Sequence, residues 1–170
     1  MNLAPRHRTL GLIVAATILL VDQLSKYAVI ALAQLPARGR IDLLPFLDFT
    51  WVENRGVSLG MLTASSELQR WLLVALTALI SVGVAIWLWR ERKAWDAFAL
   101  ALVLGGAIGN IIDRVRYGYV ADFIDLHIGE FRPFLIFNVS DSAITIGVVV
   151  LLLRALLIRD KAEPTETSDA

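Results

Sequence analysis

Residues 71–89 read WLLVALTALISVGVAIWLW, an apolar run without a single charged side chain. A helix needs roughly 20 mostly apolar residues to cross the hydrocarbon core of a bilayer. Three further stretches reach about that length, at residues 10–33, 97–115 and 139–158. Because four such stretches leave too little polar sequence to cover a water-soluble core, the pattern predicts an all-α membrane protein with four transmembrane helices.

The composition excludes several classes of protein. Of the 170 residues 57% are hydrophobic, and the 16 basic residues balance the 16 acidic ones, so we expect no nucleic-acid partner. There is no cysteine, which excludes disulfides, a cysteine nucleophile and thiolate-bound metals. The two histidines, His7 and His127, do not form a His-Glu-x-x-His motif. We expect no metal and no cofactor, and neither histidine receives a role.

The predicted organisation is one four-helix domain over residues 1–159, followed by a polar, disordered tail at 160–170. The outer loops are expected at 34–70 and 116–138, and the apolar pattern at 41–52 predicts a small β element between the first two helices. Basic residues at 90, 92 and 93 occupy the tight link between helices two and three, so the positive-inside rule places both termini in the cytoplasm. A cleaved signal peptide is the alternative for residues 10–33, since Ala31-Leu32-Ala33 matches the A-x-A pattern.

Polar residues lie where lipid is expected. A charged side chain at mid-membrane costs on the order of 2.5–3.5 kcal/mol, so it is kept only where it faces protein or water. Asp22 and Lys26 are four residues apart and can pair on one helix face. With the predicted orientation, every such residue falls near the outer ends of the helices, which indicates a site at the outer interface. The full set is Asp22, Lys26, Asn110, Asp113, Arg114, Asn138 and Asp141.

Two carboxylates suggest the chemistry of this site. Asp122 follows the third predicted helix and Asp141 begins the fourth, and the loop between them is long enough to bring them together. Two close carboxylates share a proton, so the ionised one can activate water while the protonated one polarises a carbonyl. Asn138 is a predicted N-cap, and the helix N-terminus favours charge on Asp141, leaving Asp122 as the proton carrier. Position alone also allows Asp122 to be a loop residue and Asp141 a helix-end charge.

Five motifs resemble those of a known family. They are DQLSK at 22–26, NRG at 54–56, GGAIGNIIDR at 105–114, VADFI at 120–124 and FNVSDSAIT at 137–145. With these motifs the chain resembles the bacterial lipoprotein signal peptidases, also called signal peptidase II, over nearly its whole length.

The resemblance implies an intramembrane aspartic endopeptidase of the bacterial inner membrane. Such an enzyme removes the signal peptide of diacylglyceryl-modified prolipoproteins, cutting before the lipidated cysteine. It implies a catalytic pair, Asp122 and Asp141, near the periplasmic face. The expected partners are these precursors and membrane lipids, and the expected state is a monomer. The resemblance also implies supporting or substrate-binding roles for Asp22, Lys26, Asn54, Gly56, Asn110, Arg114 and Asn138.

Two other functions are compatible with parts of the sequence. A serine hydrolase is suggested by GVSLG at 56–60, which matches a nucleophile elbow, with Ser58, Asp125 and His127 in hydrolase order. A small transporter or proton channel using the intramembrane carboxylates is the non-enzymatic alternative. Transport sites usually lie at the bilayer midplane, often with internal repeats, whereas this polar cluster is predicted near one face.

Overall fold

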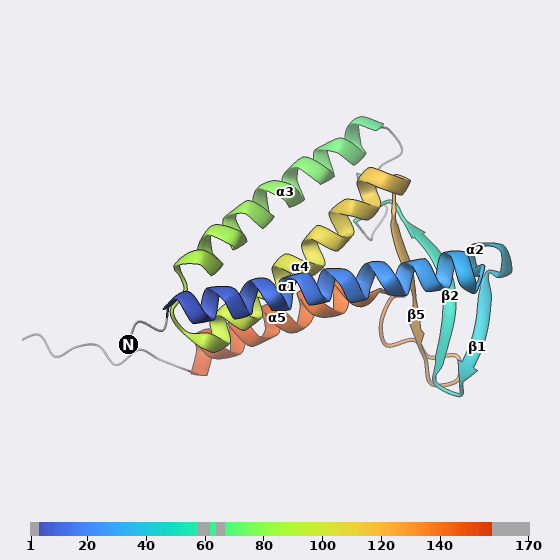
Figure 1. The fold of residues 1–170 in the computed structure, drawn as a ribbon. Coiled ribbons are helices and arrows are strands. Elements are labelled where there is room, and N and C mark those ends of the chain that lie inside the picture. Colours follow the sequence, from blue (N-terminus) through green and yellow to red (C-terminus); the bar gives the residue numbers. More distant parts are fainter. Residues whose placement is uncertain (1–3, 58–61, 64–66, 158–170) are drawn as a thin grey trace, which may run out of the picture.

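Four long helices form the body of the protein (Figure 1). The computed structural model describes residues 4–57, 62–63 and 67–157, so the predicted tail at 160–170 and Ser58 lie outside the described residues. In the described part, four helices are long and apolar enough to cross a membrane, as the sequence predicted. They are α1 (Ala4–Tyr27), continued by the π-helix η1 (Ala28–Leu32), α3 (Glu67–Arg90), α4 (Ala94–Tyr117) and α5 (Val139–Leu157).

Helix α4 is the centre of the bundle and packs against α1, α3 and α5 (Figure 1). Small residues let these backbones approach closely. A Cβ added at Gly105 would lie 2.6 Å from the carbonyl oxygen of Ala15 in α1, a separation that would force the two helices apart. Since α1 packs on α4 in this way, residues 10–33 are part of the bundle. The lipid-facing sides of α1, α3 and α5 instead carry exposed leucine, isoleucine and valine side chains.

A three-stranded antiparallel sheet caps one end of the bundle, with the order β1-β2-β5. Strands β1 (Arg40–Leu44) and β2 (Leu47–Asn54) confirm the β element predicted over 41–52. The chain enters β1 through a short helix, α2 (Leu35–Arg38), and leaves β2 through the small hairpin of β3 (Gly56–Val57) and β4 (Leu62–Thr63).

The third strand of the sheet, β5 (Val120–Leu126), corrects the loop predicted at 116–138. It comes from between α4 and α5 and pairs with β2, with Val52 opposite Asp122. Helix α4 ends where Gly118 adopts a left-handed φ of 85°, which favours glycine, and the chain turns into the strand. Five of the seven residues of β5 are buried, on both faces of the strand, so the alternation of apolar and polar residues that marks a half-buried strand is absent.

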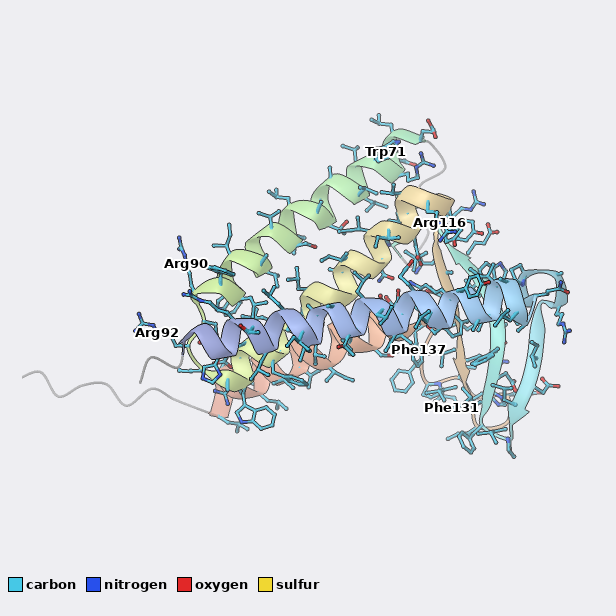
Figure 2. The ribbon with its side chains drawn as sticks, viewed as in Figure 1. Trp71, Arg90, Arg92, Arg116, Phe131 and Phe137 are labelled. Atoms are coloured by element: carbon cyan, nitrogen blue, oxygen red, sulfur yellow. The ribbon has the colours of Figure 1, made fainter. Side chains whose placement is uncertain are left out.

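The sheet lies at one end of the bundle, and the beginning of α1 and the end of α5 lie at the other (Figure 1). Figure 1 shows the beginning of α1 and the end of α5 close together, away from the sheet. Arg90 and Arg92, in the link between α3 and α4, lie at the same end as these two helix ends, whereas Trp71 and Arg116 lie toward the sheet (Figure 2). Because four helices run the length of the bundle and a short link joins α3 to α4, α1 begins and α5 ends at the same end as that link.

Candidate active site

Two aspartates are connected through side-chain amides where the sheet meets the bundle. Asp122 lies within β5, and Asp141 lies in the first turn of α5. The Asn138 amide donates a hydrogen bond of 2.6 Å to Asp122 Oδ1, and the Asn110 amide donates one of 2.8 Å to Asp141 Oδ1. Asn138 Nδ2 also lies 3.4 Å from Asn110 Oδ1, so the four side chains form one continuous polar network.

Asn138 connects the two aspartates because it caps α5, as the sequence predicted. Its side-chain oxygen accepts a 2.9 Å hydrogen bond from the backbone N–H of Asp141, and its own N–H donates to Asp141 Oδ2 at 3.4 Å. This reciprocal pair resembles a capping box and fixes Asp141 at the positive end of the helix. Phe137 pairs with Ile124 of β5 through backbone hydrogen bonds, which brings Asn138 alongside Asp122.

The second oxygen of Asp122 is bound from β2. The Asn54 amide donates a 3.0 Å hydrogen bond to Asp122 Oδ2, and its own oxygen accepts one of 3.2 Å from the backbone N–H of Gly56. The pairing of Val52 with Asp122 places Asn54 at this distance, since it lies two residues further along the strand on the same face. Gly56 therefore contributes to the site through its backbone.

Burial makes Asp122 a weaker acid than an ordinary aspartate. Only 2% of the residue is exposed. Burial, followed by the charge of Asp141, raises the pKa of Asp122 from 3.8 to about 7, while the hydrogen bonds from Asn54 and Asn138 oppose the rise. Asp122 therefore keeps its proton up to about pH 7, far above the range of an ordinary aspartate. The pair has the electrostatic asymmetry required of one acid and one base.

A buried ion cluster lies behind the two aspartates. The Lys26 ammonium lies 2.8 Å from Asp22 Oδ2 and 2.6 Å from Asp113 Oδ2, and all three side chains are almost completely buried. The Gln23 amide donates to both carboxylates, at 3.1 and 3.2 Å. The predicted pairing of Asp22 with Lys26 is confirmed, and the cluster extends from α1 to α4.

This cluster also holds the backbone next to each aspartate. Asp22 Oδ1 accepts a 2.9 Å hydrogen bond from the N–H of Ser140, and Asp113 Oδ2 accepts one of 3.2 Å from the N–H of Ala121. Ser140 and Ala121 immediately precede Asp141 and Asp122 in the chain.

Helix α4 contributes a close contact and a positive charge. A Cβ at Gly109 would lie 2.6 Å from Asp22 Oδ2, so only glycine leaves room for the cluster. Arg114 donates a 3.3 Å hydrogen bond to the carbonyl oxygen of Asn110, and its guanidinium interacts electrostatically with Asp141 and Asp122.

The structure brings all nine predicted catalytic and supporting residues into one network. Sequence reasoning gave Gln23 no role and counted Asp113 only among the intramembrane polar residues. The spacing of Asp113 from Asn110, one helical turn, is the signal that could have assigned it to the site. Ala121 and Ser140 take part through backbone N–H groups, which leave no mark on residue type. The predicted residues in direct contact with the network are Asp22, Lys26, Asn54, Gly56, Asn110, Arg114, Asn138, Asp122 and Asp141.

The two histidines and Asp125, the described members of the alternative sites, lie outside this network. His7 is in the early part of α1, at the end of the bundle away from the sheet. His127 Nε2 lies 2.7 Å from Asp48 Oδ2, whereas Asp125 is bound by Thr50 and Arg132. The Asp125–His127 pair that a serine hydrolase would need is therefore replaced by two separate pairings. No group of three metal-binding side chains occurs among the residues that the structure describes.

Comparison with known proteins matches the chain to a family over most of its length. The family described as "Signal peptidase (SPase) II" matches residues 14–157. The chain belongs to the signal peptidase II family. It is 58% identical to a lipoprotein signal peptidase of Rhizorhabdus wittichii, over 96% of this chain and 95% of that one. It is 53% identical to one of Sphingopyxis alaskensis, over 89% and 88%.

Solved structures of bacterial membrane enzymes share the fold. One, described as "Bacterial membrane enzyme structure by the in meso method at 2.3 A resolution", aligns with a TM-score of 0.74 and 28% sequence identity, covering 91% of this chain and 94% of that one. A second, described in the same words at 1.9 Å, aligns with a TM-score of 0.73 and 29% identity. A four-helix, multi-pass membrane protein is the architecture expected of signal peptidase II, a protease that processes lipoproteins.

Proposed function

We propose that this signal peptidase II is an aspartic endopeptidase that removes the signal peptide of diacylglyceryl-modified prolipoproteins, cutting before the lipidated cysteine. The observation that carries the proposal is the amide-bridged pair of Asp122 and Asp141, with unequal environments, at one end of the bundle. Membership of a family of lipoprotein signal peptidases supports the choice of substrate.

The two aspartates divide the chemistry between them. Asp141, at the N-terminus of α5 and hydrogen-bonded by Asn110, is the ionised member and takes a proton from the attacking water. Asp122, which keeps its proton up to about pH 7, donates it to the scissile carbonyl oxygen as the water oxygen bonds to the carbonyl carbon. Collapse of the tetrahedral intermediate breaks the C–N bond. The proton held by Asp141 passes to the leaving amine, and the hydroxyl proton returns to Asp122.

The surrounding residues hold this pair in register. Asn54, Asn110 and Asn138 orient the carboxylate oxygens, and the cluster of Asp22 and Lys26 fixes the backbone beside Asp141. The remaining predicted residues, Gly56 and Arg114, act through the Asn54 hydrogen bond and through positive charge at the aspartates.

The proposed location is the bacterial inner membrane, with both termini cytoplasmic and the site near the periplasmic face. The first and last helix ends lie at the same end of the bundle as Arg90 and Arg92, which the positive-inside rule places in the cytoplasm (Figure 2). The sheet and the aspartate pair then lie on the periplasmic side, where a lipid-modified precursor presents its cleavage site. We propose that the enzyme acts as a monomer.

Cleavage of a lipid-modified precursor in detergent by Asp122→Asn and Asp141→Asn tests the proposal. Each variant should lose nearly all activity while keeping its helical content and thermal transition, because each removes one half of the acid–base pair. Asp42→Asn is the matched control, since Asp42 is an 81% exposed aspartate on the same sheet, away from the pair. If either variant of the pair cuts at close to the wild-type rate, the aspartate mechanism is wrong.

The alternatives make different predictions. A serine hydrolase would lose all activity in Ser58→Ala, whereas the aspartate mechanism leaves its cleavage largely intact. A transporter would move ions across liposomes and leave the precursor uncut. Either result, obtained with folded protein, would overturn the proposal.

A further inference from the structure

A large apolar pocket lies against Asp141, between α5 and the loop of residues 127–138 that follows β5. Its volume is about 340 Å³. This is more than twice the roughly 150 Å³ of an apolar cavity that can hold benzene. The polar part of its wall is formed by Asp141, Ser142 and Thr145 of α5. The apolar lining comes from Leu126, Phe134, Leu135, Phe137 and Ile146.

The outer wall of the pocket is open toward the surface. Phe134 is 63% exposed and Ile146 is 54% exposed, although both are large apolar side chains. Ile146 belongs to the lipid-facing side of α5, so the pocket opens toward lipid, and its concave apolar lining suits an apolar ligand. Figure 2 marks Phe137 where the chain passes from the sheet to α5, so the pocket lies at the level of the aspartate pair.

The pocket is continuous with the membrane-facing side of α5. Val149 and Leu152, one and two turns beyond Thr145, are exposed on this helix within its membrane-spanning length. A long apolar chain entering the pocket at Asp141 could therefore continue along α5 into the bilayer without crossing a polar surface. The side chain of an amino acid has no such continuation.

The chemistry of the substrate supplies a chain at this position. If the proposed function holds, as this inference requires, the scissile bond precedes a cysteine whose sulfur carries the diacylglyceryl group. The acyl chains then begin within a few bonds of the carbonyl that the aspartates attack. We propose that the pocket beside Asp141 binds one acyl chain of the substrate's diacylglyceryl group and so aligns the scissile bond with the pair.

Two substitutions test the pocket from opposite directions. Thr145→Phe fills it, and Phe134→Ala removes one wall. The matched controls are Leu79→Phe, an exposed position on α3, and Phe131→Ala, an exposed phenylalanine of the same loop, neither of which lines the pocket.

Each enzyme is assayed in detergent on two precursors of identical peptide sequence, one with dipalmitoyl and one with dibutyryl glyceryl on the cysteine. Thr145→Phe should raise KM for the dipalmitoyl precursor about tenfold, with little change in KM for the dibutyryl one and the effect on KM rather than kcat. Tenfold corresponds to about 1.4 kcal/mol, the burial of about two methylene groups. Phe134→Ala should give a smaller change of the same kind, and both controls should match the wild type.

Other outcomes overturn the acyl-chain assignment. Equal changes for the two precursors, or none, would mean that the pocket does not read chain length. A third precursor keeps the dipalmitoyl group and carries a different residue before the cysteine. A change in KM that follows this residue instead of the acyl chain would assign the pocket to the signal peptide. Failure of the proposed function would look different. The wild-type enzyme would then leave both precursors uncut, or Asp122→Asn and Asp141→Asn would still cut them.

Discussion

Replacing Asn54 with leucine should move the alkaline limb of the pH–rate profile. The Asn54 amide donates a 3.0 Å hydrogen bond to Asp122 Oδ2 and thereby favours the charged carboxylate. In the proposed mechanism Asp122 must be protonated, so activity falls as pH rises through its pKa of about 7. Leucine has a similar size and no donor, so its substitution raises that pKa and shifts the limb to higher pH.

The size of the shift follows from the lost hydrogen bond. A hydrogen bond to a charged group contributes about 1.5–3 kcal/mol, and one pKa unit corresponds to about 1.4 kcal/mol. Part of that contribution also stabilises the protonated acid, and Asn138 still donates to the other oxygen. We therefore expect a limb near pH 8 in Asn54→Leu, about one pKa unit above the wild type. The limb belongs to the coupled pair and not to Asp122 alone.

The assay is cleavage of a lipid-modified precursor at saturating concentration between pH 5 and 9.5, with each profile normalised to its own maximum. Normalisation separates the shift from the lower rate expected when a positioning side chain is removed. Thr50→Val is the matched control, because the Thr50 hydroxyl donates to Asp125 on the same sheet and not to Asp122. A limb that stays in place in Asn54→Leu, or moves toward acid, would refute the assigned proton carrier.

Three further perturbations have defined outcomes. Lys26→Met leaves two buried carboxylates without their cation and should lower the free energy of unfolding by about 3–5 kcal/mol, measured by chemical unfolding in detergent. Gly109→Ala should lower both the thermal transition and the cleavage rate, because the new Cβ meets Asp22, whereas Gly83→Ala, with no atom within 4 Å, should be neutral or stabilising by about 0.5–1 kcal/mol. Asp122 binds its proton more tightly in the folded protein than in the unfolded chain. The free energy of unfolding should therefore fall by about 4 kcal/mol as pH rises from about 4 to about 7. Thermal unfolding measured across this pH range should show the decrease in the wild type and not in Asp122→Asn.

The transmembrane helices could be predicted because the bilayer imposes a length and an apolar character on each of them. The uncharged run at 71–89 is enough to indicate α3, and the other three helices follow the same rule. The cost of polar groups in lipid also singled out Asp22, Lys26 and Asn110 before any contact was known. Their shared depth predicted that they would meet, and the structure brings them to one end of the bundle.

Strand β5 and the contacts it makes were decided by the tertiary structure. With five of its seven residues buried, β5 lacks the alternation that distinguishes a strand from a loop, and its register on β2 alone brings Asn54 to Asp122. The support from Ala121 and Ser140 uses backbone N–H groups, which every residue except proline possesses. Amino-acid sequence thus determined which segments enter the membrane and which side chains must avoid lipid, since both depend on transfer between solvents. The partners of those side chains depend on where separate segments meet in space, which the folded chain alone determines.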